Sequence, residues 1–279
     1  MTSLSERTPD IFTNNYRILK LIGQGGYGKV WLSARLSDNK LFAAKMVPDI
    51  RCRRKSWCTD REVYLPDEVT LWEGLDHPNI IKLEEVFSEQ GSWIFVMEYL
   101  VGYTDLFTLS ELHGTLSESE ATGVIRQITD VCWYLMEEEV DHRDIKDENI
   151  LYNPVTQQIK LIDFGSASFL EIDQRYHSLQ GTEVYNPPEL YNTGSYDPIS
   201  GIVWSIGCLA FVLVNGDIPF NNKTEVMEYK QLTWFNDGMS PIYKDFVERC
   251  MQRVEILRID FFKLRLHPLL RGKGFRSGS

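Results

Sequence analysis

One charged segment, residues 142–149, constrains the fold and chemistry of this chain more than any other. It reads His-Arg-Asp-Ile-Lys-Asp-Glu-Asn, and five of its residues match the pattern H-R-D-x-K-x-x-N. At average residue usages of about 5%, chance produces this pattern in roughly one chain in ten thousand. A solvated loop would not explain its position between a helical pattern and an apolar strand. Asp144 can accept a hydroxyl proton, Lys146 can neutralise an anion, and the amide oxygen of Asn149 can bind a metal ion.

A second acidic motif follows the first at short range. Asp163-Phe164-Gly165 comes directly after an apolar run and lies 19 residues beyond Asp144. The tripeptide alone is common, but its position after two short strands that flank the turn at residues 154–158 makes it specific. A carboxylate there can hold a magnesium ion that bridges phosphates. The two motifs predict Asn149 and Asp163 as metal ligands.

A glycine-rich run near the start of the chain has the pattern G-x-G-x-x-G-x-V, with Gly23, Gly25, Gly28 and Val30 at its fixed positions. Residues without side chains let backbone N–H groups approach phosphate oxygens closely. The pattern alone is weak, because chance produces it in about one chain in ten of this length. A dinucleotide-binding fold would need a helix after the glycines, and here a strand pattern continues.

Lys45 closes an apolar strand pattern. A buried ammonium group needs an anionic partner, although a lysine at a strand edge can also extend to solvent. Glu68, on a helix predicted after Pro66, is the expected partner. Glu62 is the alternative, and Pro66 separates it from that helix.

The distribution of patterns predicts an α+β fold. Residues 16–46 alternate as strands around the glycines, and residues 92–100 read as a buried strand. From Ser117, which forms an S-x-x-E capping box with Glu120, helical patterns dominate, and residues 203–214 read as a buried core helix. We expect a small antiparallel β-sheet lobe with one main helix and a larger, mostly α-helical lobe. The predicted segments are a flexible N-terminus 1–15, an N-lobe 16–98, a hinge 99–104, a C-lobe 105–270 and a flexible tail 271–279.

Charge and cysteine usage narrow the partners and the compartment. The formal net charge is −11, which disfavours nucleic acid and anionic membrane surfaces as partners. Residues 60–149 hold 22 acidic against 5 basic residues, which indicates either a solvated helical surface or an acidic groove for a basic partner. Five cysteines without a C-x-x-C pair, and a polar N-terminus, predict a soluble protein of the cytoplasm that can also occur in the nucleus.

Together these motifs resemble the eukaryotic protein kinases over residues 16–270. The resemblance implies a bilobal fold, ATP and Mg²⁺ as cofactors, and transfer of the γ-phosphate to protein hydroxyls. It implies that Asp144 is the catalytic base, that Lys146 contacts the phosphate, and that Lys45 pairs with Glu68. It also implies a nucleotide site with the following parts: Gly23, Gly25 and Gly28 over the phosphates, Val30 and Ala43 against adenine, Met97 as gatekeeper, Glu98 and Leu100 in the hinge, and Leu151 as the floor.

Finer features resemble serine/threonine kinases of the PIM and PAS-domain kinase branch, within the calmodulin-dependent kinase group. Lys146 and Thr182 match the serine/threonine type, and the resemblance implies that Thr182 contacts the substrate. Three positions depart from the family: Asp141 replaces an apolar residue before His142, Ile202 stands where most kinases have aspartate, and Leu100 replaces the PIM hinge proline. The resemblance further implies that Glu189 pairs with Arg258.

Regulation and specificity are less constrained. Ser178 resembles the family's phosphorylation position, with Arg143 as receptor for the phosphate, although a constitutively active enzyme is equally compatible. Asp105 and Glu148 match positions that contact arginines in basophilic kinases, so we expect basic protein or peptide substrates and a monomeric enzyme. The alternatives are a pseudokinase that acts as an ATP-binding scaffold and a small-molecule kinase. Small-molecule kinases lack the H-R-D-x-K spacing that this chain has.

Overall fold

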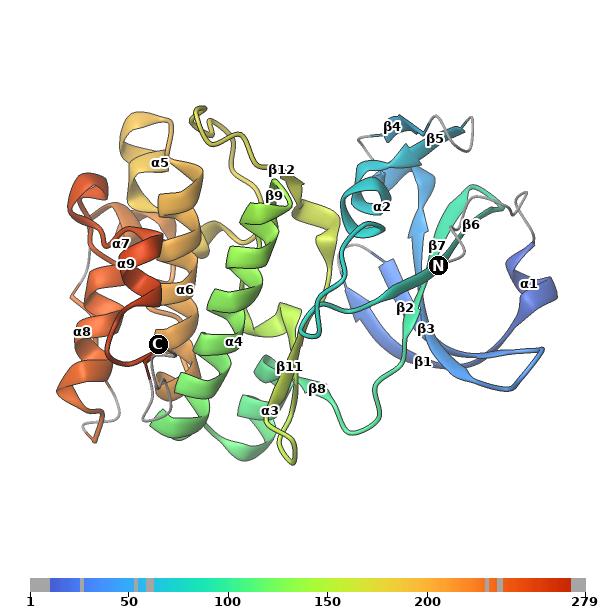
Figure 1. Cartoon of the computed structure of the whole chain (residues 1–279), viewed down its shortest axis with the longest axis horizontal. Coiled ribbons are helices and arrows are strands. Elements are labelled where there is room, and N and C mark those ends of the chain that lie inside the picture. Colours follow the sequence, from blue (N-terminus) through green and yellow to red (C-terminus); the bar gives the residue numbers. More distant parts are fainter. Residues whose placement is uncertain are drawn as a thin grey trace, which may run out of the picture. The chain divides into compact units, whose positions relative to one another are not determined.

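The computed structural model describes residues 11–25, 28–52, 55–58, 63–228, 231–234 and 238–271. The chain divides into two compact units, Met1–Val101 and Gly102–Ser279. The division falls inside residues 99–104, where the hinge is expected. Each unit has its own architecture and core (Figure 1).

The first unit is built on a five-stranded antiparallel sheet with the strand order β1-β2-β3-β7-β6 (Figure 1). Its strands are β1 Tyr16–Gly25, β2 Gly28–Arg35, β3 Leu41–Pro48, β6 Leu83–Glu89 and β7 Ser92–Glu98. The strands follow from runs of β-branched and aromatic residues. Strand β3 is central, so residues on both of its faces are buried, including Phe42, Ala44 and Lys45. The position of Lys45 on a doubly covered strand is what removes its ammonium group from water.

The N-terminal segment is more ordered than the sequence predicts. Residues 12–15 form a helical turn, α1 Phe12–Asn15. The Phe12 side chain is 1% exposed and its ring stacks on Tyr16 at a centroid distance of 5.3 Å. The expectation of a flexible segment is therefore wrong for these residues, because one aromatic side chain docks the turn onto the sheet. Residues 1–10 and 272–279, where flexible ends were also predicted, lie outside the described residues.

A short hairpin precedes the helix of the first unit. Strands β4 Lys55–Cys58 and β5 Val63–Pro66 pair antiparallel, and α2 Asp67–Trp72 follows directly. The helix begins after Pro66, as predicted, and ends at Trp72. Because it begins at Asp67, Glu68 lies in its first turn, where a carboxylate interacts favourably with the helix dipole.

The second unit is mostly helical. Its helices are α3 Leu106–His113, α4 Glu118–Glu137, α5 Pro188–Thr193, α6 Pro198–Asn215, α7 Lys223–Glu228, α8 Pro241–Cys250 and α9 Phe261–Arg265. Its short strands are β8 Thr104–Asp105, β9 Val140–Asp141, β10 Ile150–Asn153, β11 Gln158–Leu161 and β12 Ser168–Phe169. Strands β11, β10 and β8 form one sheet and β12 pairs with β9. The predicted α+β class, with a small antiparallel sheet unit and a larger helical unit, is confirmed.

Two helices form the centre of this unit. The capping box of α4 is present in full, since Ser117 and Glu120 bond reciprocally, and the apolar stripe behind it is buried. Helix α6 is long and apolar enough to cross a membrane by length and composition, but 83% of that window is buried inside the protein. The prediction of a buried core helix is confirmed.

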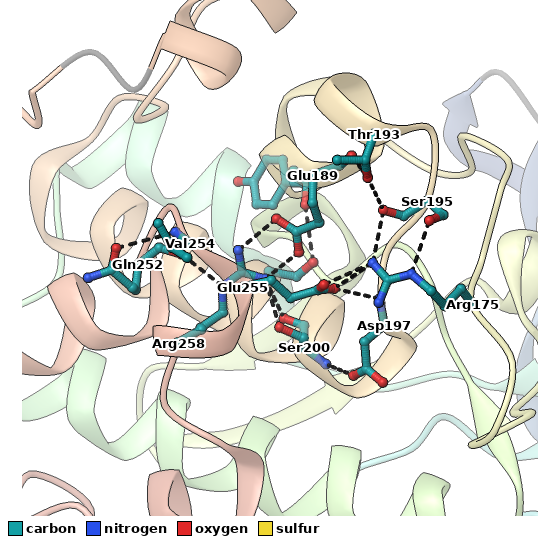
Figure 2. A network of polar contacts seen from close by, with 12 residues as sticks. Arg175, Glu189, Thr193, Ser195, Asp197, Ser200, Gln252, Val254, Glu255 and Arg258 are labelled. Atoms are coloured by element: carbon teal, nitrogen blue, oxygen red, sulfur yellow. Dashed lines mark hydrogen bonds and ion pairs between the residues drawn. The ribbon is translucent and has the colours of Figure 1, made fainter.

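A buried ion pair joins α5 to the loop before α9. The Arg258 guanidinium donates from Nη1 to Glu189 Oε1 at 2.7 Å and from Nη2 to Glu189 Oε2 at 2.9 Å (Figure 2). Arg258 also donates to Ser200 and to the carbonyl of Gln252, and it lies over the Trp204 ring. The predicted pairing of Glu189 with Arg258 is confirmed, and nearly every donor of the guanidinium is used.

Replacing Arg258 by methionine should lower the free energy of unfolding by about 3–5 kcal/mol, because it leaves the Glu189 carboxylate buried without its cation. The double variant Glu189→Leu/Arg258→Met should recover much of that loss, since neither charge remains. Chemical denaturation measures both. The matched control is Arg249→Met, which removes an exposed pair with Asp245 and should cost under about 1 kcal/mol. Equal losses for Arg258→Met and Arg249→Met would contradict the prediction.

Candidate active site

The H-R-D-x-K-x-x-N pattern at residues 142–149 forms a loop between β9 and β10, and Asp144 lies at its centre with 6% exposure. Asp144 Oδ1 accepts hydrogen bonds from the backbone N–H of Thr182 at 2.9 Å and from its hydroxyl at 3.0 Å. Asp144 Oδ2 accepts from the Asn149 amide at 2.9 Å. Three donors from two separate segments therefore hold this carboxylate in one orientation, which is what a general base requires.

Backbone contacts bring the second acidic motif to this loop. The N–H of Ile162 donates to the carbonyl of Asn149 at 2.9 Å, and the Ile162 carbonyl lies 3.1 Å from His142 Nε2. The Phe164 ring meets the edge of the His142 ring at 5.0 Å. Asp163, between Ile162 and Phe164, has a left-handed backbone with φ of 65°. Asp163 therefore directly follows Ile162, whose backbone N–H bonds to the Asn149 carbonyl.

The oxygen atoms of this pair fit a magnesium ion. Hydrogen bonds to Asp144 use the Asn149 amide nitrogen, so the amide oxygen is the group that remains for a cation. Among the described residues there is no cluster of three or more His, Cys, Asp or Glu side chains that could hold a metal. An asparagine oxygen and one carboxylate suit Mg²⁺, which keeps water and substrate phosphates as its other ligands. The prediction of Asn149 and Asp163 as metal ligands stays a prediction.

Lys146 lies between two carboxylates. Its ammonium nitrogen is 2.7 Å from Glu148 Oε2 and 3.7 Å from Asp144 Oδ2. Burial works against the charged form, but the hydrogen bond to Glu148 and the charge of Asp144 outweigh it and raise the pKa of Lys146. The lysine therefore carries its positive charge at neutral pH, beside the predicted base.

In the first unit, the predicted pair of Lys45 and Glu68 is present. Lys45 Nζ on β3 lies 2.7 Å from Glu68 Oε1 on α2, and the two side chains are only 8% and 12% exposed. The alternative partner, Glu62, lies outside the described residues. Because an ammonium group on β3 would be costly to bury alone, the helix α2 must be in place for the lysine to keep this position.

The glycine-rich run forms the hairpin of β1 and β2, with Gly25 opposite Gly28. Gly26 and Tyr27 at its tip lie outside the described residues. Gly28 has φ of 155°, and a Cβ there would overlap the carbonyl oxygen of Met46 on β3. Around Gly25 no atom lies within 4 Å of the position a Cβ would take. The glycine at position 28 is thus required by the approach of a neighbouring strand, whereas space is open beside Gly25.

The residues predicted to contact adenine occupy adjacent strands in the first unit. Val30 pairs with Lys45 across β2 and β3, and Ala43 pairs with Met97 across β3 and β7. Glu98 ends β7, and its carboxylate accepts from the Lys82 N–H at 3.0 Å. Leu100 follows in the linking segment. Leu151 belongs to the second unit, where it lies on β10 opposite Lys160 and Asp105.

The residues predicted to bind substrate have structural partners as well. Asp105 is the N-cap of α3, and its carboxylate accepts from the Thr108 N–H at 2.7 Å. Glu148 pairs with Lys146, yet its side chain is 55% exposed. Thr182 bonds to Asp144 through its backbone and its hydroxyl. The Thr182 contact explains why the segment after the D-F-G motif lies against Asp144, but it does not identify a substrate.

The segment that carries Ser178 is anchored on both sides. The backbone N–H of Tyr176 donates to the Tyr196 carbonyl at 2.9 Å, and the N–H of Tyr196 donates to the Tyr176 carbonyl at 3.0 Å. Beside it, Arg175 donates to Ser195 and pairs with Glu255 at 2.8 Å, and Glu255 also accepts from the Asp197 N–H at 2.7 Å (Figure 2). These contacts tie the segment to the loop between α5 and α6, and no signal in the sequence alone indicated them.

Ser178 itself is exposed. Arg143, its predicted phosphate receptor, donates from Nη2 to the Ser178 carbonyl at 3.2 Å. The Arg143 guanidinium also lies 4.4 Å from the centre of the Tyr176 ring. The arginine is therefore close to Ser178, and it already stabilises the segment without a phosphate through a cation–π contact.

Gly181 is a further site residue, and sequence reasoning missed its role. Its φ is 63°, and a Cβ there would overlap the Arg143 carbonyl and lie 2.7 Å from Asp144 Oδ1. The absence of a side chain lets the segment approach the loop closely enough for Thr182 to reach Asp144. Its position directly before Thr182 was the available signal.

Comparisons with known proteins agree with this geometry. Residues 16–270 match the family model described as protein kinase domain. The chain is 32% identical to the serine/threonine-protein kinase pim-2 of Danio rerio, over 86% of this chain and 79% of the relative. It is 32% identical to the serine/threonine-protein kinase prk-2 of Caenorhabditis elegans, over 92% of this chain and 58% of the relative. It is 28% identical to the CBL-interacting protein kinase 21 of Oryza sativa subsp. japonica, over 95% of this chain and 51% of the relative. The chain therefore spans only about half to three fifths of the last two.

Gly181→Ala should lower the rate of phosphoryl transfer to a peptide by about 10–100-fold, because small displacements of a catalytic group are costly. The matched control is Gly194→Ala. Gly194 has a similar φ of 79°, but no atom lies within 4 Å of its Cβ position. Both variants should lose about 1–2 kcal/mol of stability from the left-handed backbone, and Gly181→Ala should lose more than Gly194→Ala because its Cβ overlaps the Arg143 carbonyl. Steady-state kinetics and thermal unfolding separate the two effects, and full activity of Gly181→Ala would contradict the assigned role.

Proposed function

Because the chain belongs to the protein kinase family and is an ATP-dependent serine/threonine protein kinase, we propose that it transfers the γ-phosphate of Mg·ATP to hydroxyls in basic, arginine-rich protein segments. The serine/threonine type and the calmodulin-dependent kinase group, both predicted from the sequence, are confirmed at the level of family and relatives. The basic preference, the site roles, a monomeric state and a cytoplasmic location are part of the proposal.

The observation that carries the catalytic proposal is the anchored carboxylate of Asp144. With Oδ1 held by Thr182 and Oδ2 by Asn149, the carboxylate can accept the proton of a substrate hydroxyl as that oxygen attacks phosphorus. The charged Lys146 beside it would stabilise the negative charge of the transferring phosphoryl group. Lys45, oriented by Glu68, would pair with the α- and β-phosphates. A magnesium ion held by Asn149 and Asp163 would neutralise phosphate charge when bound.

These contacts favour a catalyst over a pseudokinase scaffold. A scaffold that only binds ATP has no need for an acidic group held in a fixed orientation, and nothing would select for the close approach at Gly181. The residues whose loss would mark a pseudokinase are all present, namely Lys45, Asp144, Asn149 and Asp163.

The basic preference rests on exposed negative charge beside the base. Glu148 lies two positions after Lys146 in the sequence and pairs with it through one oxygen, while its side chain remains 55% exposed. An arginine of a substrate can bind the free side of that carboxylate, because guanidinium groups bind carboxylates with two parallel hydrogen bonds. Asp105 contributes a second carboxylate, although it also caps α3.

A positional-scanning peptide library with Mg·ATP tests substrate class and preference together. We expect phosphorylation of serine and threonine acceptors, with arginine enriched on the N-terminal side of the acceptor. Glu148→Gln should reduce that enrichment by about 3–10-fold, since one charge-assisted contact is lost. The matched control is Glu137→Gln on the exposed end of α4. Equal phosphorylation of basic and acidic peptides would contradict the preference without affecting the assignment as a kinase.

Asp144→Asn is the control for the catalyst itself. It should abolish transfer in the same library while stabilisation by Mg·ATP in thermal unfolding persists, because the nucleotide contacts assigned above do not include Asp144. Turnover equal to that of the wild type would show that Asp144 is not the base.

Ser178 is proposed as an adjusting site and not as a required switch. Arg175, Tyr176 and Arg143 already anchor its segment in the absence of a phosphate. Ser178→Ala should therefore retain turnover within about twofold, whereas Arg175→Ala should lower it by about tenfold, since the segment loses its contacts to Ser195 and Glu255. Peptide kinetics of protein expressed in bacteria measures both. A large loss in Ser178→Ala would instead support phosphorylation as a switch.

A further inference from the structure

Asp141 is a buried carboxylate that the proposed mechanism does not use. It is the last residue of β9, pairs with Ser168 of β12, and is 5% exposed. Burial disfavours the charged form and raises the pKa of Asp141 to about 6, although the nearby Arg143 acts in the opposite direction. Removing a carboxylate from water is unfavourable for folding. The buried Asp141 carboxylate must therefore make a contact that explains its position.

That contact is a hydrogen bond to the backbone of the catalytic loop. Asp141 Oδ1 accepts from the N–H of Arg143 at 3.1 Å. Arg143 has φ of 62°, a left-handed conformation that residues with a side chain adopt rarely and at a cost. A short acidic side chain that accepts from the backbone two residues on stabilises a turn of this kind. Asp144 follows this turn directly, so the turn sets the direction in which the Asp144 side chain projects from the loop.

The neighbouring helix offers no charged group for this purpose. A small cavity beside the loop is lined by Asp141, Arg143 and Asp144 and, from α6, by Pro198, Gly201, Ile202 and Ser205, whose hydroxyl donates to the Tyr185 carbonyl. Helix α6 contains no acidic or basic residue, and Ile202 is 7% exposed. The acceptor for the Arg143 N–H thus comes from the loop itself.

We propose that Asp141 is a positioning residue, whose carboxylate oxygen holds the left-handed turn at Arg143 and thereby aims Asp144 at the substrate hydroxyl. This inference rests on the proposed function of Asp144 as base. It requires an acceptor oxygen at position 141 and not a negative charge. Asparagine should therefore replace aspartate, and leucine should not.

The central test compares Asp141→Leu with Asp141→Asn. Asp141→Leu should lower kcat for a peptide by about 10–100-fold, with KM for ATP unchanged, because the turn before the base is no longer held. Asp141→Asn should keep kcat within about threefold. Asp141→Leu should also unfold at the same or a higher temperature at pH 8, because a buried charge is gone. A residue with a merely structural role would lower activity and stability together.

The pH dependence of stability gives an independent signature. A carboxyl group whose pKa is raised in the folded state contributes stability below its unfolded pKa and loses it as pH rises through about 6. Asp141→Asn should therefore raise the thermal midpoint by about 3–6 °C at pH 8 and by little at pH 4. Comparing the wild type with Asp141→Asn at the same pH cancels the contribution of the other charged and titratable groups near Asp141. The charged neighbour is Arg143, and the titratable neighbours are Cys132 of α4, Tyr176 and Tyr196; burial raises the pKa values of these last three groups.

The matched control is Asp260→Leu. Asp260 makes the same kind of contact at the start of α9, where its carboxylate accepts a hydrogen bond from the Lys263 N–H at 2.9 Å. It should lower stability and leave kcat unchanged. Amide hydrogen exchange at Arg143 should accelerate in Asp141→Leu and stay slow in Asp141→Asn. If Asp141→Leu does not fold, Asp141→Ala, which also lacks the acceptor, carries the same expectations.

Normal kcat and normal exchange at Arg143 in Asp141→Leu would overturn the inference. Loss of kcat in Asp141→Asn equal to that in Asp141→Leu would also overturn it, because the charge and not the acceptor would then matter. Neither result affects the assignment of Asp144, which depends on the separate Asp144→Asn control in the same assay.

Discussion

The Asp144 carboxylate is the point on which the arrangement of the catalytic loop depends. One of its oxygens is held by Thr182 from the segment after the D-F-G motif, and the other by Asn149 from its own loop. Each of these donors is itself fixed. Thr182 is held close to the loop because Gly181 has no side chain to collide with Arg143 and Asp144, and Asn149 is held because its carbonyl accepts from the Ile162 N–H. A buried carboxylate with these donors has one favourable orientation. The orientation of the Asp144 carboxylate thus follows from backbone geometry at Gly181 and Ile162.

Buried charge recurs in this fold, and each instance has a different partner. Lys45 is compensated by Glu68, and Arg258 by Glu189 with additional neutral acceptors. Such pairs add little net stability compared with apolar side chains, but loss of one partner is costly. Their effect is to fix α2 on β3 and α5 on the loop before α9. Asp141 differs, because the carboxylate accepts a hydrogen bond from a neutral backbone N–H. A group buried at a cost and directed at a strained turn is more readily explained by function than by stability.

The sequence predicted the parts of this protein whose signals are local. The H-R-D-x-K-x-x-N loop, the capping box at Ser117 and the buried helix α6 are each encoded in a short window. Two pairings at long range were predicted: Lys45 with Glu68, because a buried ammonium group needs an anionic partner, and Glu189 with Arg258, because the family pattern named both partners. Arg175 and Glu255 are 80 residues apart, and no periodicity links them. The requirement for glycine at positions 28 and 181 depends on strands and loops that approach from elsewhere, so the residue type was visible and its reason was not.

The acidic stretch of residues 60–149 illustrates the same limit for charge. A count of charges cannot separate a solvated surface from carboxylates that accept hydrogen bonds inside the fold. Glu137 to Glu139 at the end of α4 are exposed, as a solvated surface requires. Others have structural partners, since Asp105 caps α3, Glu118 accepts from Ser240, and Glu85 accepts from Tyr16. The negative balance is therefore neither one groove nor uniform background. Much of it closes helix ends and loops, and Glu148 beside Lys146 keeps the exposed carboxylate that we propose as a contact for a basic substrate.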